Sequence, residues 1–176
     1  MDYAKNNVFC TLYICWGAQA GLYHHYGIQK QNLDEKIFGI FKHYKTTVAE
    51  PLLRGFDDIF PAPQSRHTEI KSEDIKKHPE LTILAESEQS GVLLVKSNDN
   101  RQIFMTGHLE YDTETLGVEY RRDLDQGKKI KMPENYYPNN DPWNTPISTW
   151  RSHAHLFYSN WLNYYVYQAT PFNFAD

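Results

Sequence analysis

The chain has 176 residues, enough for one domain with a hydrophobic core, and its formal net charge is −4. This acidic balance argues against nucleic-acid or anionic-membrane partners, and no apolar run approaches the ~20 residues that span a bilayer. Cys10 and Cys15 are too few and too close for a disulfide framework, and the first ten residues lack a signal peptide's apolar stretch, so we expect a reducing, cytoplasmic setting.

The first part of the chain predicts two strands and one helix. Residues 8–14 form a β-branched and aromatic run that is typical of a buried strand. Residues 17–26 predict a helix that Gly27 ends, and residues 37–44 indicate a second strand. Residues 50–66 are rich in turn formers and predict an irregular loop.

The middle of the chain predicts three strands between two helices. Ser72 is a candidate cap for a short helix that Pro79 ends. The strand candidates are residues 81–86, 91–97 and 101–107. Asp112 or Thr113 can cap a longer helix that reaches about residue 126, with Gly127 at its end.

The last part of the chain predicts an irregular segment followed by a helix. Residues 131–148 lack periodicity, and Thr145-Pro146 is a suitable cap and first position for a final helix. One face of that helix is apolar: Trp150, Ala154, Phe157, Trp161 and Tyr164. Because strands and helices mix and the apolar runs suit burial on both faces, we expect an α/β fold with a mainly parallel sheet flanked by helices.

Cys15 follows the first predicted strand, in the spacing C-x-G-x-Q. A thiol is a nucleophile as its thiolate, and a helix N-terminus or a nearby histidine lowers the pKa of such a thiol. A sharp strand-to-helix turn supplies the first condition and needs small neighbours, which Gly17 and Ala18 provide. A buried cysteine after a strand is also a common inert core residue, so the spacing alone leaves both interpretations open.

His108 is the histidine that best fits a catalytic base. It follows a predicted strand and Gly107, and ligand sites in α/β sheets gather at such strand ends. Glu110, two residues later, can orient the imidazole. Cysteine, histidine and carboxylate then have the roles of a catalytic triad, although a lone loop histidine has the same local sequence. No Cys/His spacing resembles a zinc site, so no metal is expected.

Two motifs resemble those of the class I glutamine amidotransferase-like (flavodoxin-like) fold: YICWGAQA, with its cysteine before a glycine, and TGHLEYD, with its His-x-Glu. Three longer segments point to one family within this fold class: residues 54–67, 106–123 and 135–172. They resemble the homoserine O-acyltransferases of bacterial methionine biosynthesis that have this fold, and the resemblance covers nearly the whole chain.

That resemblance implies acyl transfer from acetyl-CoA or succinyl-CoA to the hydroxyl of L-homoserine. It implies that Cys15 forms an acyl-thioester, that His108 is the general base and that Glu110 is its partner. No cofactor is expected beyond the acyl-CoA co-substrate. Family members are usually homodimers, so a homodimer is expected here.

The resemblance also implies three substrate-binding residues. Lys36 matches a substrate-contacting lysine, Ser65 a position near the acyl group, and Arg122 the arginine that holds the homoserine carboxylate. A guanidinium binds a carboxylate bidentately, which agrees with the role of Arg122. By themselves these residues are also typical of a solvated surface. The backbone amide of Trp16, after Cys15, is a plausible oxyanion donor.

The chain departs from the family at its N-terminus, because members carry a substantial portion ahead of the cysteine strand. We therefore expect residues 1–176 to be the C-terminal part of a single catalytic domain, truncated at the N-terminus and with an incomplete sheet. The missing portion is expected to choose between acetyl and succinyl. The segment WRSHAHLFYSNW is more similar to family members that use acetyl-CoA, which favours acetyl as the acyl group.

Two other functions stay open at this point. One is a glutamine amidotransferase-like hydrolase that feeds ammonia to a partner, against which Arg122 and the long C-terminal stretch argue. The other is an inactive truncated remnant.

Overall fold

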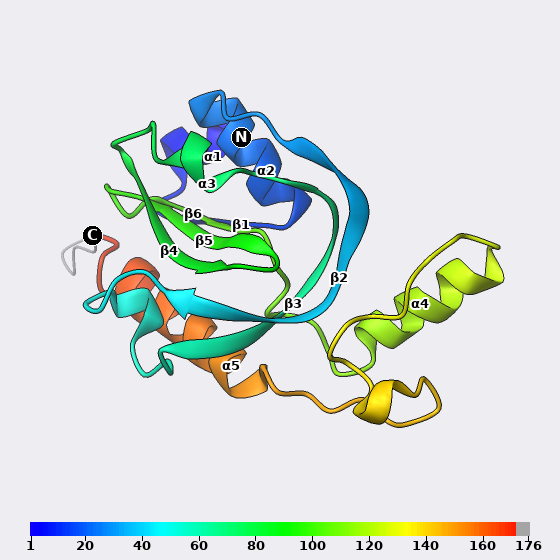
Figure 1. Cartoon of the computed structure of the whole chain (residues 1–176). Helices are drawn as coiled ribbons and strands as arrows, with labels where there is room; N and C mark the ends of the chain where they lie inside the picture. The colour runs from blue at the N-terminus through cyan, green and yellow to red at the C-terminus, as the bar shows by residue number, and fades with distance from the viewer. Residues whose placement is uncertain (172–176) are drawn as a thin grey trace.

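The computed structural model describes residues 1–171 (Figure 1). Its helices are α1 (Asp2–Asn7), α2 (Trp16–Tyr26), α3 (Ser72–Ile75), α4 (Thr115–Asp125) and α5 (Arg151–Asn160), with a π-helical continuation at Trp161–Tyr167. Its strands are β1 (Thr11–Ile14), β2 (Gln31–Lys45), β3 (Ile59–Glu69), β4 (Leu81–Ser87), β5 (Gly91–Ser97) and β6 (Gln102–Met105). Short 3-10 turns occur at Pro51–Leu53 and Pro138–Asn140. No helix within residues 1–171 combines the length and apolar character that crossing a membrane requires.

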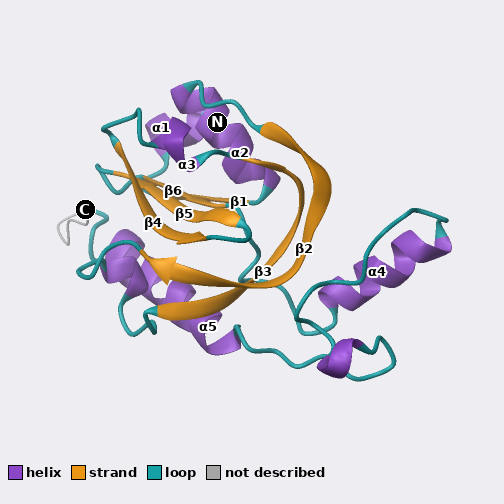
Figure 2. Cartoon of the chain, viewed as in Figure 1, coloured by secondary structure: helices purple, strands orange, loops and turns teal. Residues whose placement is uncertain are grey.

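The strands form one curled sheet in the order β1-β6-β5-β4-β2-β3 (Figure 2). Among the described strands only β1 and β6 pair in parallel, and the other four pairings are antiparallel. The α/β class is confirmed, but the prediction of a mainly parallel sheet is wrong. The physical reason is loop length: residues 88–90 and 98–101 join β4 to β5 and β5 to β6, and such short turns leave no room for the crossover that a parallel pair needs.

Strand β3 corrects a second prediction, the irregular loop at residues 50–66. It pairs along most of its length with β2, which is itself longer than the predicted strand. Pro61 and Pro63 explain the error, because proline cannot donate to a strand ladder and is usually a sign of a loop. Here β3 is at the edge of the sheet, where proline is tolerated.

The final helix begins later than Pro146, where the sequence predicted it. Helix α5 starts at Arg151, after Trp150, whose indole is buried and donates to the backbone carbonyl of Tyr111 over 3.0 Å. This tertiary contact fixes the start of the helix, so the local signal of Thr145-Pro146 is overridden. Helix α2, by contrast, ends at a left-handed Gly27 as predicted.

Apolar side chains pack on both faces of the sheet. In β6, Ile103 and Met105 belong to the core cluster that includes Trp150 and Phe157 of the α5 side, while Phe104 belongs to the opposite cluster with Leu22 of α2. Figure 1 shows α1, α2 and α3 gathered on one side, α5 on the other, and α4 projecting away from the body.

Candidate active site

Cys15 lies at a sharp turn between β1 and α2. Its φ is 50° and its ψ is −114°, a left-handed conformation that residues with a side chain rarely adopt. The Cys15 N–H donates to the carbonyl of Met105 over 2.7 Å, and the Cys15 carbonyl accepts from the N–H of Gln19 over 3.1 Å. The turn is therefore held on both sides, with the thiol at a helix N-terminus, where negative charge is favoured.

His108 follows β6 at the same edge of the sheet. Because β1 and β6 are parallel, their carboxyl ends meet, and the residues that follow them lie close together. The His108 N–H donates to the carbonyl of Pro63 over 2.9 Å. A Cβ atom on Gly107 would lie 2.8 Å from that carbonyl oxygen, so glycine permits this close approach to β3.

Cys15, His108 and Glu110 form a connected set. The Nδ1 atom of His108 lies 2.6 Å from Oε1 of Glu110, and the imidazole is close enough to Cys15 for the thiol to influence its pKa. Burial of the ring favours the neutral imidazole, but the hydrogen bonds and negative charges of Cys15 and Glu110 outweigh burial and raise the pKa of His108 to about 9. With Nδ1 facing Glu110, Nε2 is the nitrogen left for the thiol.

The ring of Tyr111 stacks on His108, a contact that the sequence motif did not reveal. The ring centroids are 4.1 Å apart and the planes differ by 17°. Burial, together with the charges of Glu119, Cys15 and Glu110, raises the pKa of Tyr111 strongly, so the phenol stays neutral. A neutral aromatic face against an imidazolium is a favourable cation–π arrangement.

The three predicted substrate-binding residues meet at Glu119, which the sequence reasoning missed. Oε1 of Glu119 lies 2.7 Å from Nζ of Lys36 and accepts a 2.9 Å hydrogen bond from Oγ of Ser65. It is also 3.7 Å from the guanidinium of Arg122. The carbonyl of Ser65 lies 3.9 Å from Sγ of Cys15. The available signal was helical spacing, since Glu119 is three residues before Arg122 on one face.

Arg122 is the more exposed member of this group. Its guanidinium bonds to Asp123 through Nε at 3.0 Å and Nη2 at 2.8 Å, and its side chain is 54% exposed. The neighbouring Arg121 instead extends toward Gly117.

The predicted oxyanion donor, the backbone N–H of Trp16, lies at the start of α2. As the first residue of α2, Trp16 has a backbone N–H without an acceptor inside the helix. The indole itself is largely exposed.

The comparisons with known proteins show the family of the chain. The sequence model of homoserine O-succinyltransferase matches residues 1–172. The chain belongs to the homoserine O-succinyltransferase family.

Curated relatives of this family member carry a related name. A protein of Geobacillus sp. (strain WCH70) named homoserine O-acetyltransferase is 61% identical over 172 residues, which cover 98% of this chain and 57% of that protein. Proteins of the same name from Acetivibrio thermocellus and Bacteroides fragilis are 58% and 57% identical over 176 and 175 residues, covering 100% and 99% of this chain and 58% and 57% of those proteins. The chain thus spans a little under three fifths of the length of these relatives.

Solved structures confirm the expected fold of the family member. A glutamine amidotransferase from Thermotoga maritima matches with a TM-score of 0.57 at 17% identity, covering 90% of this chain and 60% of that one. A glutamine amidotransferase from Methylobacillus flagellatus matches with a TM-score of 0.59 at 14% identity, covering 92% and 65%. At such identities the likeness is one of fold alone, and it confirms the glutamine amidotransferase-like class.

Gln19 is a supporting residue that gives the C-x-G-x-Q spacing a physical purpose. Its amide donates to the backbone carbonyl of Thr68 over 3.1 Å, and its carbonyl accepts from the Thr68 hydroxyl over 2.5 Å. These two bonds fasten the first turn of α2 to β3, three residues beyond Ser65. They hold the helix that presents Cys15 against the strand that presents Ser65.

One group within residues 1–171 has metal-ligand character, away from Cys15. Ligand atoms of Asp2, His24 and His25 lie within 4.8 Å of one another, and the Nε2 atom of His24 is 2.7 Å from Asp2. His25 instead bonds the hydroxyl of Tyr13 over 3.2 Å. The chemistry at Cys15 involves none of them, and the expectation of no metal or cofactor stays a prediction.

Proposed function

We propose that this chain carries the catalytic cysteine of a homoserine O-acyltransferase, which moves an acyl group from acyl-CoA to the hydroxyl of L-homoserine. The observation that supports this most is the joining of two clusters. Cys15, His108 and Glu110 can carry out acyl transfer. The carbonyl of Ser65 lies beside the thiol, and the Ser65 hydroxyl leads to Glu119, which also contacts Lys36 and Arg122, charged groups that suit an amino acid.

In the first half-reaction, His108 takes the proton of the Cys15 thiol. The thiolate attacks the thioester carbonyl, and the Trp16 N–H stabilises the oxyanion. The bond from the carbonyl carbon to the sulfur of coenzyme A then breaks, and His108 returns the proton to the leaving thiolate. Cys15 is left acylated.

In the second half-reaction, neutral His108 takes the proton of the homoserine hydroxyl. The hydroxyl oxygen attacks the acyl-thioester, a carbon–oxygen bond forms, and the bond to Sγ of Cys15 breaks. The proton returns from His108 to the sulfur, which completes the double displacement.

The amino acid is held by groups of opposite charge. The guanidinium of Arg122 binds the homoserine carboxylate bidentately, and the carboxylate of Glu119 accepts from its ammonium. Lys36 and Ser65 support this role because they position Glu119 through direct bonds.

Acetyl is the proposed acyl group. The curated relatives carry the name homoserine O-acetyltransferase, while the family itself is named after succinyl transfer, so both donors are tested. We also propose action in methionine biosynthesis, in the cytoplasm, as a homodimer. Sedimentation of the purified protein tests the dimer.

Intact-mass measurement after mixing with each donor tests the proposal. An acetyl adduct from acetyl-CoA that disappears in Cys15→Ala, and that L-homoserine discharges, is the expected result. His108→Asn should abolish both steps. An acyl label on Cys15→Ala would contradict the role of Cys15. Hydrolysis of glutamine in place of adduct formation would favour the hydrolase alternative, and a folded protein without any adduct would favour the inactive remnant.

A further inference from the structure

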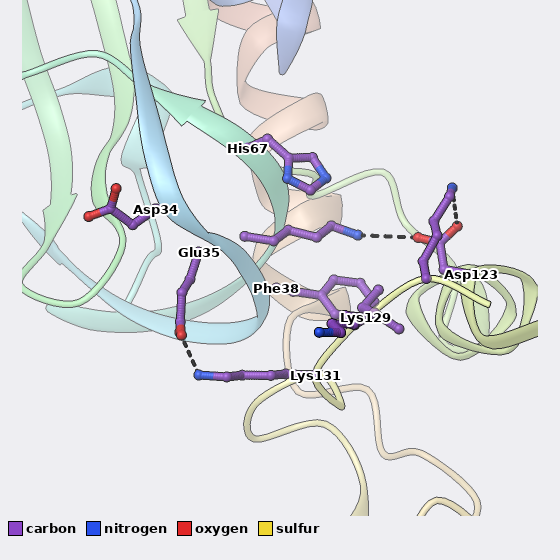
Figure 3. A pocket seen from close by; sticks show the side chains of 10 residues that line it. Asp34, Glu35, Phe38, His67, Asp123, Lys129 and Lys131 are labelled. Atoms are coloured by element: carbon purple, nitrogen blue, oxygen red, sulfur yellow. Dashed lines mark hydrogen bonds and ion pairs between the residues drawn. The ribbon is translucent and has the colours of Figure 1, made fainter. Parts of the chain in front are cut away.

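A cavity of about 670 Å³ lies between β2, the C-terminal end of α4 and the segment that follows α4 (Figure 3). Its wall is formed by Asp34, Glu35, Lys36, Phe38, His67, Asp123, Lys128, Lys129, Ile130 and Lys131. Apart from Lys36, none of these residues was singled out as a site residue by the sequence. The cavity is larger than a small amino acid requires and falls within the range of sites for drug-sized ligands.

Four lysines and three carboxylates line the cavity, so its wall carries an excess of one positive charge. Lys128 pairs with Asp123 at 3.0 Å and Lys131 with Glu35 at 2.5 Å. Lys129 has no carboxylate within 4.0 Å in the part of the chain that the structure describes. In Figure 3 the carboxylate of Asp34 points away from the lysine side chains. Exposed ion pairs such as Lys131–Glu35 contribute little to stability. An anionic ligand can therefore replace the carboxylate as the partner of such an ammonium group.

The floor of the cavity is apolar. Phe38 is buried, and the ammonium of Lys36 lies 3.8 Å from the centre of its ring. Ile130 adds a second apolar side chain from the opposite wall. Apolar surface flanked by several ammonium groups suits a ligand that combines a flat or aliphatic body with phosphates.

A short chain of contacts joins this cavity to the nucleophile. Lys36 lines the cavity and bonds Glu119, which accepts from Ser65, whose carbonyl is 3.9 Å from Sγ of Cys15. A long thioester can therefore place its reacting carbonyl at Cys15 and its remote end among the lysines. In a double displacement the amino acid arrives only after coenzyme A leaves, so the two ligands do not compete for space at one moment.

We propose that this cavity binds the phosphate-bearing nucleotide end of the acyl-CoA donor, with Lys128, Lys129 and Lys131 contacting its phosphates. This inference rests on the proposed function, and it names the part of the chain that recognises the donor. Ammonium groups bind phosphate as point charges, so the contribution weakens as salt rises.

Two thioesters separate recognition of the nucleotide from chemistry at Cys15. Acetyl-CoA has the phosphates, and S-acetyl-N-acetylcysteamine keeps the thioester but lacks them. The rate of Cys15 acetylation by each donor is followed by intact mass. In Lys129→Gln, which breaks no ion pair, the ratio of the acetyl-CoA rate constant to that of the small thioester should fall about tenfold, since one charged contact is lost. Lys76→Gln removes an exposed charge from the α3 region and should leave the ratio unchanged.

A second measurement needs no variant. Adenosine 3′,5′-bisphosphate should inhibit acetylation by acetyl-CoA at low salt, while adenosine should not. Two results would overturn the nucleotide site and leave the proposed function intact. In the first, both donors acetylate Lys129→Gln and the ratio of their rate constants is unchanged. In the second, the variant loses only its affinity for homoserine. Absence of acetylation with either donor would overturn the proposed function, and the nucleotide site with it.

Discussion

Cys15 donates its backbone N–H to the carbonyl of Met105 over 2.7 Å, and this bond joins the segments that carry the nucleophile and the base. Ile14 and Met105 are register partners in β1 and β6, the parallel pair of the described sheet. Three residues after Met105 the chain reaches His108. The relative position of thiol and imidazole is therefore set by strand pairing, which is more rigid than loop packing.

The left-handed backbone of Cys15 predicts an unusual order of stability among its variants. Glycine adopts a φ of 50° without the clash of a Cβ atom, whereas alanine retains that clash. Cys15→Gly should therefore exceed Cys15→Ala in free energy of unfolding by about 1 kcal/mol, although both lack the nucleophile. Urea denaturation of the two variants measures the difference. Equal stabilities would show that the turn is unstrained.

Much of this site was accessible from the sequence because its motifs are local. Cys15 follows a strand and precedes a helix, and His108 and Glu110 are two residues apart, so short-range patterns marked them as candidates and the family resemblance supplied their roles. Strand direction was predicted wrongly because it was inferred from the apolar runs of β4 and β5, which suit either core, and not from the loops between the strands, which are too short for a parallel crossover. Glu119 was missed because its importance depends on Lys36 and Ser65, which are distant in sequence and come together only in the fold.

The raised pKa of His108 predicts a pH-dependent contribution to stability. A group whose pKa rises from 6.5 to about 9 on folding stabilises the protein fully below pH 6.5, and that stabilisation is lost as pH rises toward 9. The stability advantage of the native chain over His108→Asn should thus shrink by about 1–3 kcal/mol between pH 6 and pH 9. Urea titrations of both proteins at the two pH values measure this difference in the free energy of unfolding. A difference that is independent of pH would refute the raised pKa of His108.

The stacked ring of Tyr111 predicts a difference between two substitutions. An aromatic face stabilises the imidazolium by about 0.5–2 kcal/mol, which corresponds to at most about 1.5 units of pKa. Tyr111→Leu should therefore lower the pKa of His108, and Tyr111→Phe should preserve it. Nuclear magnetic resonance titration of the imidazole distinguishes them. If both variants shift the pKa alike, the hydroxyl and not the ring face is responsible.

The contacts of Glu119 predict that its loss affects the second half-reaction most. Glu119→Gln removes the charge that pairs with Lys36 and that suits the substrate ammonium, so transfer from acetylated Cys15 to L-homoserine should slow by roughly 10–100-fold. Acetylation of Cys15 should change much less. Single-turnover measurements separate the steps, and Asp125→Asn, an exposed carboxylate of the same helix, is the matched control. Equal slowing of both steps would argue for a structural role.

The return of the chain from the α4 region to the sheet depends on Gly39. The N–H of Glu134 donates to the carbonyl of Phe38 over 2.9 Å, and the N–H of Ile40 donates to the carbonyl of Glu134 over 2.8 Å, so residue 134 lies directly on β2. A Cβ atom on Gly39 would lie 2.3 Å from the Glu134 carbonyl oxygen, and the φ of Gly39 is 145°.

Gly39→Ala should therefore lower the free energy of unfolding by about 2–4 kcal/mol, because neither backbone can give way without losing these bonds. Gly17→Ala is the matched control, since a Cβ atom there meets nothing within 4 Å and alanine favours the helix. Urea denaturation should show a large loss for the first variant and none for the second. A mild effect at Gly39 would mean that the segment at residue 134 is free to move, and that Lys128–Lys131 are not held against β2.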